Sequence, residues 1–392
     1  MKLRRSLATL ILTATSVALF SCGGPDKKAA AAAPEPKAPK TIDIPRSREA
    51  DDAARFLAGM PGTEGSPFRE LENDPVWVDH GKKFDQLWGV FEKQRLPGMK
   101  EFQTSDLTGK EIDDATAFYP FSGPDILTVA TFFPKHKNYL MSALEPPGTV
   151  PTLARIKKRP LAEQLALHRK TLDDLLQLSF FVTRAMDKEL RGQVTDGLMT
   201  PIIIELARTH NKILGHRYFR LDENGELVER ENDPGAAMKN KGVAIEFQRE
   251  GEPGTHKLIY ISLNLSDESL GPNQAYQKYV ARFKPVVTFL KSTSYMPHAD
   301  NFKIIRDAIL DYSTAIVQDD TGVPYRFFTP DKWNVQLYGG YVRPIRVFSW
   351  RMQKDLKAAY DSAQGLKDLP FAMGYGSRSA KSNLQIARRK NP

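Results

Sequence analysis

Large apolar residues recur at helical spacing in two long segments of the first half of the chain. In residues 75–94 and 160–181 they fall three, four or seven positions apart, and most charged residues lie off the stripe. The two stripes consist of Trp77, Phe84, Leu87, Trp88 and Phe91, and of Leu161, Leu165, His168, Leu172, Leu175 and Leu176. We predict two long helices, with His168 packed in the interior and not acting as a ligand.

Three later segments each combine a loop, a short helical stripe and an apolar strand. They are residues 122–146, 200–222 and 298–320, and in the second Thr200 suits the N-cap and Pro201 the first helical position.

A hairpin is predicted among these segments, because residues 242–248 and 257–265 alternate apolar and polar positions around a Gly-Pro-containing turn. Helices that alternate with strands are typical of an α/β layered fold. We therefore expect a helical N-terminal part and a mixed, mainly parallel sheet with one inserted hairpin, occupying residues 49–376 as one elaborated domain or two lobes.

The chain begins with basic residues and an apolar run, Leu7 to Phe20, of only fourteen residues. A membrane-spanning helix needs about 20, so the run is typical of a secretion signal over residues 1–21. The sequence "LFSC" that ends at Cys22, the one cysteine of the chain, resembles the lipobox of bacterial lipoproteins. The resemblance implies cleavage before Cys22 and acylation of that residue, and two or more acyl chains anchor a protein stably to a membrane. The alternative is an ordinary cleaved signal.

Residues 22–48 are rich in Gly, Ala, Pro and Lys and contain no large apolar residue before Ile42. Such a composition does not fold, so we predict a flexible tether between the lipid and the body. Gly23 stands where an Asp would retain a lipoprotein at the inner membrane, by resemblance to the sorting rules of double-membrane bacteria. The expected location is the bacterial cell envelope, at the outer membrane if the host has one.

The net charge of +9 is concentrated at the two ends of the chain. The leader contributes three positive charges, residues 22–48 a net three and residues 377–392 five, which leaves residues 49–376 with a net charge of −2. A nucleic-acid-binding protein would need a basic face on the body itself, so we expect no nucleic-acid partner. We predict that residues 377–392 are a basic tail that contacts anionic lipid or simply aids solubility.

The candidate site lies around "FYPFSGPD", where a strand over 118–121 runs into a tight loop. A helix and a second strand ending at Glu145 follow. Ligands bind beyond the carboxyl ends of strands in open α/β sheets, so the candidate ligand-binding residues are Tyr119, Ser122, Gly123, Asp125 and Glu145. The layout is similar to a nucleotide half-site, but it has one glycine where such sites need several, and we predict no cofactor. Alternatively, the loop is a structural turn and Asp125 caps its helix.

Other catalytic chemistry has little support in the sequence. There is no G-x-S-x-G motif, and the seven histidines form no H-E-x-x-H motif or paired cluster, so we predict no metal site. Asp319-Asp320-Thr321-Gly322 suits a turn better than a cation site. Asp125 and Glu145 could act as a catalytic carboxylate pair in the hydrolysis of an envelope polymer.

Recurrent blocks of the body resemble a family of uncharacterised exported bacterial proteins across roughly residues 115–388. The blocks are "YPFSGPD", "YLMSALEPPG", "DDTGVPYRFF", "LYGGYVRPI" and "LPFAMGYGSRSAKSNL". The family has no established activity, so the resemblance implies a shared body and no functional residues. The leading hypothesis is a lipid-anchored envelope protein that contacts membrane lipid through acylated Cys22 and whose body binds an unknown envelope ligand or protein. The alternative is the hydrolase.

Overall fold

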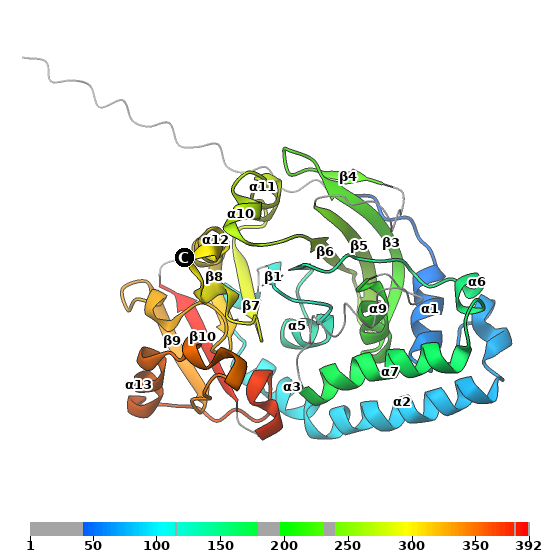
Figure 1. Cartoon of the computed structure of the whole chain (residues 1–392), viewed down its shortest axis with the longest axis horizontal. Helices are drawn as coiled ribbons and strands as arrows, with labels where there is room; N and C mark the ends of the chain where they lie inside the picture. The colour runs from blue at the N-terminus through cyan, green and yellow to red at the C-terminus, as the bar shows by residue number, and fades with distance from the viewer. Residues whose placement is uncertain (1–41, 114–115, 179–196, 231–239, 380–381, 391–392) are drawn as a thin grey trace, which may run out of the picture. The chain divides into compact units, whose positions relative to one another are not determined.

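The computed structural model describes residues 42–113, 116–178, 197–230, 240–379 and 382–390, all within one compact unit, Lys37–Pro392. Its centre is a mixed sheet (Figure 1). The strands are β1 Thr116–Pro120, β2 Asn138–Ala143, β3 Asn211–Leu221, β4 Leu227–Glu229, β5 Lys241–Arg249, β6 His256–Ser262, β7 Val286–Leu290, β8 Ser313–Gln318, β9 Trp333–Gly339 and β10 Asn383–Arg389. They are ordered β4-β3-β5-β6-β2-β1-β7-β8-β10-β9. The predicted α/β fold with a mixed sheet is confirmed.

The five central strands, β6-β2-β1-β7-β8, are parallel, and the strands outside them pair antiparallel. The chain enters this parallel part at β1, moves out through β2 to β6, and returns to the other side of β1 for β7 and β8. Helix α5 (Ile126–Phe132), between β1 and β2, packs on one face, whereas α12 (Lys303–Tyr312), between β7 and β8, packs on the other. This is a doubly wound sheet whose connections reverse direction between β1 and β7.

The parallel strands are buried on both faces, which explains their nearly continuous apolar sequences. Every residue of β7 and β8 is buried, and successive residues of β1 contribute to separate cores, Ala117 and Tyr119 to one and Phe118 to the other. Charged side chains are thereby excluded from β1, β2, β7 and β8, and in β6 the one lysine, Lys257, lies at the start of the strand.

Helices cover the sheet on both faces. The helices of the N-terminal part are α1 Glu49–Leu57, α2 Pro75–Gln94, α3 Leu96–Ser105 and α4 Lys110–Asp113. Two later helices pack against them, α7 Leu161–Leu178 against α2 and α9 Met199–Arg208 against α1. Others are α6 Leu153–Ile156, α10 Asp267–Leu270, α11 Ala275–Ala281, α13 Lys354–Ser362, and the 3₁₀ segments η1 Pro67–Leu71, η2 Met296–His298, η3 Asp300–Phe302, η4 Tyr325–Phe327, η5 Arg346–Arg351 and η6 Gly374–Ser379. None of the helices in the described ranges is long and apolar enough to cross a membrane.

The two long predicted helices are confirmed as α2 and α7, which lie side by side (Figure 1), and residues 179–181 of the second prediction lie outside the described residues. Helix α2 begins where the Asp74 carboxylate accepts a hydrogen bond of 2.8 Å from the Val76 N–H, with Pro75 in the first position. His168 is buried on α7, and burial lowers its pKa to about 4, so its ring is neutral at physiological pH, as expected of a packed histidine.

The helix predicted to begin after Thr200 starts earlier, at Met199. The N–H groups of Leu198 and Met199 donate to the carbonyls of Pro146 and Pro147, at 3.0 and 2.7 Å. These contacts take the place of a side-chain cap, and Thr200 is buried inside the helix. The predicted hairpin is confirmed as β5 and β6, although β6 ends at Ser262, before the predicted end of the strand.

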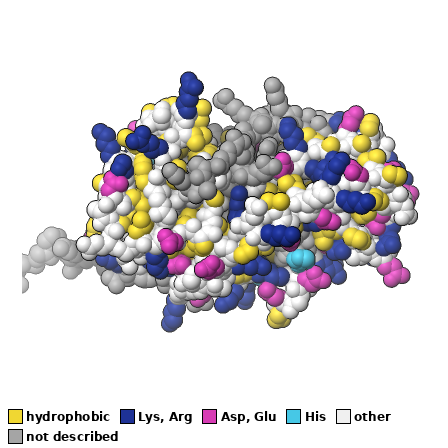
Figure 2. All heavy atoms as spheres, turned by 90° about the horizontal axis from the view of Figure 1, so that it is seen from below, with side chains coloured by type: hydrophobic (Ala, Val, Ile, Leu, Met, Phe, Trp, Pro, Cys, Tyr) yellow, Lys and Arg dark blue, Asp and Glu magenta, His cyan; other side chains and the backbone are white. Residues whose placement is uncertain are grey.

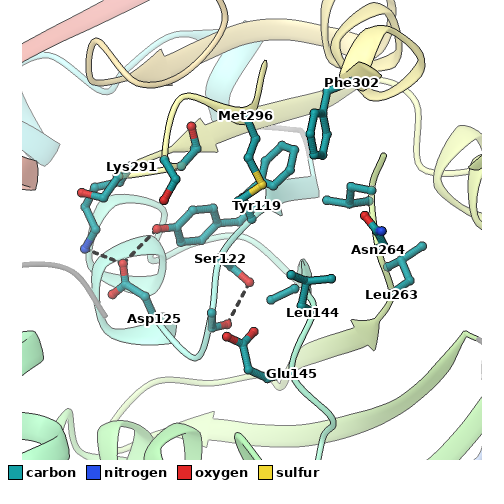
Figure 3. A pocket seen from close by; sticks show the side chains of 17 residues that line it. Tyr119, Ser122, Asp125, Leu144, Glu145, Leu263, Asn264, Lys291, Met296 and Phe302 are labelled. Atoms are coloured by element: carbon teal, nitrogen blue, oxygen red, sulfur yellow. Dashed lines mark hydrogen bonds and ion pairs between the residues drawn. The ribbon is translucent and has the colours of Figure 1, made fainter. Parts of the chain in front are cut away.

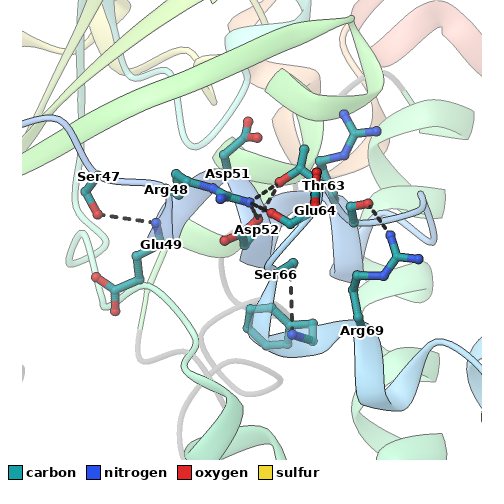
Figure 4. A network of polar contacts seen from close by, with 12 residues as sticks. Ser47, Arg48, Glu49, Asp51, Asp52, Thr63, Glu64, Ser66 and Arg69 are labelled. Carbon is teal, nitrogen blue, oxygen red and sulfur yellow. Dashed lines mark hydrogen bonds and ion pairs between the residues drawn. The ribbon is translucent and has the colours of Figure 1, made fainter.

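The folded body begins before residue 49, the boundary expected from composition. Ile44 is buried against the sheet, and the Ser47 N–H donates to the Leu214 carbonyl at 3.0 Å. Arg48 then joins this segment to the loop before η1, because its guanidinium donates to the Thr63 hydroxyl and pairs with Asp52 at 3.6 Å (Figure 4). The predicted tether therefore ends several residues earlier than residue 48.

The stretch expected to be a basic tail contributes β10, which lies between β8 and β9. Leu384 and Ile386 are buried in the core, and the Arg389 guanidinium donates to the Ser313 carbonyl at 2.8 Å and stacks on Trp333. The body therefore extends to Arg389. The charged end of the stretch obscured a short alternation of apolar residues that a strand requires.

Candidate functional site

A cavity of about 130 Å³ lies at the carboxyl edge of the parallel strands, where the sheet reverses its direction of connection (Figure 3). The loops that follow β1, β2, β6 and β7 form its walls. All five candidate residues predicted from the sequence line this one cavity: Tyr119, Ser122, Gly123, Asp125 and Glu145. The position agrees with the general rule for ligand sites in doubly wound sheets.

The loop after β1 turns sharply because two of its residues have left-handed backbone conformations, Phe121 with φ of 62° and Gly123 with φ of 55°. The Ser122 N–H donates to the Ser142 carbonyl of β2 at 3.0 Å, which holds the loop on the sheet. Asp125 ends the loop as the N-cap of α5, and its Oδ1 accepts from the Thr128 N–H at 3.1 Å. Asp125 thus caps a helix and lines the cavity at the same time.

A buried ion pair forms the polar end of the cavity. Lys291 follows β7 directly, and its Nζ lies 2.5 Å from Oδ2 of Asp125, both side chains being only 2% exposed. The Tyr119 hydroxyl donates to the same Oδ2 at 3.0 Å, and Lys291 also donates to the Thr128 hydroxyl at 2.9 Å. Burial, followed by the nearby Asp125 carboxylate, raises the pKa of Tyr119 well above its usual value, so it remains a protonated donor.

Glu205 lies against the same cluster from α9 and is fully buried. Its Oε2 accepts from the Leu127 N–H at 2.8 Å, and its Oε1 has no hydrogen-bond partner among the described residues. Burial and the charge of Asp125 raise the pKa of Glu205 well above its usual value. Glu205 does not line the cavity. Its role is to accept a hydrogen bond from the first turn of α5, which holds the start of that helix in place.

The rest of the cavity wall is mainly apolar. Met296 and Phe302 lie on one side, and Leu263 and Asn264 follow β6 on another (Figure 3). Glu145 lies near the turn formed by Ser122 and Gly123. The sequence placed Glu145 at the end of its strand, but β2 ends at Ala143, and the Tyr260 hydroxyl donates to the Glu145 carbonyl at 2.6 Å.

The loop after β7 has the most unusual backbone in this region. Ser292, Ser294 and Tyr295 all have φ between 53° and 56°, a region that residues other than glycine seldom adopt. Such conformations cost about 1–3 kcal/mol each and persist where surrounding contacts impose them, commonly at functional sites. Ser292 and Ser294 both line the cavity, which places this strain in its wall.

The contacts that impose this backbone come from the turn after β8. Asp319 accepts from the Ser292 N–H at 2.9 Å, Thr321 accepts from the Thr293 N–H at 2.8 Å, and Asp320 accepts from the Tyr295 hydroxyl at 2.5 Å. Burial and the adjacent Asp320 raise the pKa of Asp319 to about 7. The described residues contain no group of three or more His, Cys, Asp or Glu that could hold a metal ion.

Sequence reasoning missed Lys291, Glu205 and the β7 loop. A signal for Lys291 was present, since a lysine that directly follows the continuously apolar run "VVTFL" must lie at the edge of a buried strand. In comparisons with known proteins, the chain matches no family model, no curated protein and no solved structure. The functional argument therefore rests on the geometry of the cavity.

Proposed function

We propose that the protein is a lipid-anchored component of the bacterial cell envelope whose α/β body binds a small ligand in the cavity at the sheet edge. The observation that supports binding is the cavity itself. It lies between β1 and β7, where the connections of the sheet reverse direction, and it is closed at one end by the buried cluster of Tyr119, Asp125 and Lys291. A buried, hydrogen-bonded ion pair provides fixed polar groups beside an apolar wall, which is typical of ligand sites.

The chemistry of the wall narrows the ligand class. Phe302, Met296 and Leu263 offer an apolar surface, and Ser122 and Glu145 offer hydrogen-bonding groups on the opposite side. The cavity is smaller than the roughly 300–1,000 Å³ of sites for drug-sized ligands. A compact ring with hydroxyl or amino substituents, either uncharged or cationic, fits these properties. The cavity is lined by two carboxylates, Asp125 and Glu145, and one ammonium group, Lys291, so an anionic ligand is disfavoured.

Hydrolysis by Asp125 and Glu145 is the second candidate, because both side chains line the same cavity. The contacts of Asp125 argue against it. Its Oδ2 accepts from Lys291 and Tyr119, and its Oδ1 accepts from the Thr128 N–H. A general acid or base must exchange a proton with substrate or water, and these contacts hold Asp125 as a structural carboxylate.

The anchoring part of the proposal is supported by the sequence around Cys22 and by the composition of residues 22–41, all of which lie outside the described residues. A lipid on Cys22 would hold the body close to the membrane and confine it to ligands of the envelope. Two or more acyl chains are sufficient for stable attachment.

Thermal-shift screening of sugars, amino sugars, nucleosides and small amines tests the binding function, followed by calorimetry on Glu145→Gln. We expect a stabilising ligand whose affinity falls at least about tenfold in this variant, because a carboxylate–ligand hydrogen bond is worth about 1.5–3 kcal/mol. Glu223→Gln, an exposed glutamate outside the cavity, is the matched control and should bind normally. The proposal fails if no compound raises the melting temperature or if both variants bind equally well. Turnover of the ligand by the wild type that is lost in Asp125→Asn would favour the hydrolase.

A further inference from the structure

Three large apolar side chains are exposed within six residues of one another near η5. Val347 is 60%, Trp350 70% and Met352 43% exposed. Scattered exposed apolar residues are normal in proteins, but a group of them marks an interaction surface. We call residues 341–352, which contain this group, the η5 surface.

The charge of the η5 surface has one sign. It includes Arg343, Arg346 and Arg351 and no acidic residue. Arg343 and Arg346 are exposed, and neither forms an ion pair with a described residue. Figure 2 shows Lys and Arg side chains interspersed with hydrophobic ones, and some Asp and Glu side chains, at the end of the unit that carries β9 and α13. An apolar group flanked by two arginines that have no ion-pair partner among the described residues complements a surface with anionic groups outside and an apolar layer beneath them.

The η5 surface is held on the body by aromatic contacts. The Phe348 ring lies 5.3 Å from that of Tyr295 and 5.8 Å from that of Tyr375, and the Trp350 ring packs at 6.2 Å from Phe348. Tyr295 belongs to the strained loop after β7, whose neighbouring residue Met296 lines the cavity. The exposed group therefore stands on a packed platform, next to the loop that forms the cavity wall.

We propose that the η5 surface docks on a bilayer that contains anionic lipids. Tryptophan is enriched at the membrane–water interface because its ring is amphipathic, and Val347 and Met352 would reach the acyl boundary beside it. Each arginine near an anionic leaflet contributes about 1 kcal/mol, which is roughly fivefold in partitioning. This contact does not depend on a lipid at Cys22 or on a ligand in the cavity, and it orients the body on the membrane.

Trp350 itself provides the readout. The chain has four tryptophans, and the other three, Trp77, Trp88 and Trp333, are each no more than 8% exposed. The experiment uses the full chain with Cys22→Ser, which carries no lipid, and adds vesicles of phosphatidylcholine with or without phosphatidylglycerol. We expect a blue shift of tryptophan emission with the anionic vesicles that is much weaker with neutral vesicles and falls as salt rises. Binding through the leader, which lacks tryptophan, would not move this emission.

The arginines are tested by the double variant Arg343→Gln/Arg346→Gln in the same background. Partitioning onto anionic vesicles, measured by titration of the emission shift, should fall about 30-fold. Lys82→Gln/Lys93→Gln on α2 removes the same charge from exposed positions elsewhere and should leave partitioning nearly unchanged. No shift on anionic vesicles, an equal shift on neutral ones, or equal loss in both double variants would overturn the proposal. A concentration-dependent shift without vesicles would overturn it as well, in favour of contact between two copies of the chain.

Discussion

Two buried acidic groups at the same edge of the sheet are stabilised in different ways. Asp125, at the start of α5, is paired with the Lys291 ammonium at 2.5 Å and lines the cavity. Asp319, after β8, has only neutral donors among the described residues, the Ser292 N–H and the N–H and hydroxyl of Thr321, and it lies outside the cavity. With no cation bonded to it among the described residues, Asp319 has its pKa raised to about 7 by burial and by the adjacent Asp320. Of these two acidic groups, the one that lines the cavity is thus the one paired with a buried cation.

The loop after β7 connects the two groups. Lys291 reaches towards α5 and Asp125, whereas Ser292 and Tyr295 bind the aspartates that follow β8. Neighbouring residues of one loop thus bind partners on the β1 side and on the β8 side of β7. The chain must turn sharply between these contacts, and Ser292 and Tyr295 adopt left-handed backbone conformations there. The geometry of the cavity wall depends on contacts that lie outside the cavity.

The strongest test of this comparison removes the cation. Lys291→Met keeps the volume of the side chain but leaves the Asp125 carboxylate buried without its counter-charge. We expect the free energy of unfolding to fall by about 3–5 kcal/mol, measured by urea denaturation at pH 7.

Two controls accompany Lys291→Met. Lys303→Met breaks the exposed pair with Asp307 and should cost about 0.5 kcal/mol or less, because exposed pairs of this kind contribute little. Adding Asp125→Asn to Lys291→Met should restore part of the loss, since no unpaired charge then remains. Equal losses for Lys291→Met and Lys303→Met would show that the buried pair has no special role.

The sequence was sufficient to predict the α/β fold, the two long helices, the hairpin and part of the candidate site, but not β10. Asp125 and Glu145 could be found because each follows a short apolar run within one β-α-β unit, so local order along the chain places them at one edge. Lys291 and Glu205 could not be assigned to the same site, because they reach it from β7 and α9, whose positions depend on the order of strands in the sheet.

The misplaced boundaries have a related cause. Residues 377–392 were predicted to be a basic tail because of their charge. In the structure, however, β10 lies between β8 and β9, and its residues Leu384 and Ile386 pair with strands that are distant in the sequence. Likewise, Ile44 is a lone apolar residue in a proline-rich segment, and only the sheet that it contacts makes it part of the core. Contacts of this kind are decided by tertiary packing, which local pattern does not reveal.

The second test concerns the acid that lacks a cation. The folded pKa of Asp319, about 7, is raised above the unfolded value, so the folded state binds more protons between about pH 4 and 7. The stability that this group contributes is present at low pH and is lost as pH rises through 7, by roughly 2–4 kcal/mol.

In Asp319→Asn this dependence disappears, so the difference in unfolding free energy between wild type and variant should change by that amount from pH 4.5 to 8. Five buried or half-buried histidines have pKa values lowered to about 4, so they oppose the trend in both proteins and cancel in the difference. They are His80, His136, His168, His216 and His298. A difference that is flat with pH would mean that Asp319 is ionised throughout, like a carboxylate with a cation beside it.

The smallest expected effect is relief of strain in the loop that joins the two acidic groups. Ser292 has φ of 53°, and its hydroxyl has no hydrogen-bond partner among the described residues, so Ser292→Gly removes no bond while its N–H still binds Asp319. A non-glycine residue in this region loses about 1–2 kcal/mol, against about 0.5–1 kcal/mol for the added backbone freedom of glycine in the unfolded chain. We expect a net gain of about 0.5–1 kcal/mol in urea denaturation.

The control is Ser362→Gly, at an exposed serine in the last turn of α13, where the helical backbone suits serine and glycine should cost about 0.5–1 kcal/mol. This substitution also removes the exposed hydrogen bond of 2.8 Å from the Ser362 hydroxyl to the Ala358 carbonyl, which adds to the expected loss. Opposite signs for the two substitutions would show that the β7 loop is held against its own backbone preference by the contacts to Asp319 and Asp320. Equal destabilisation would mean that the loop adopts this conformation without strain, and the cavity wall would then need no support from the acidic turn after β8.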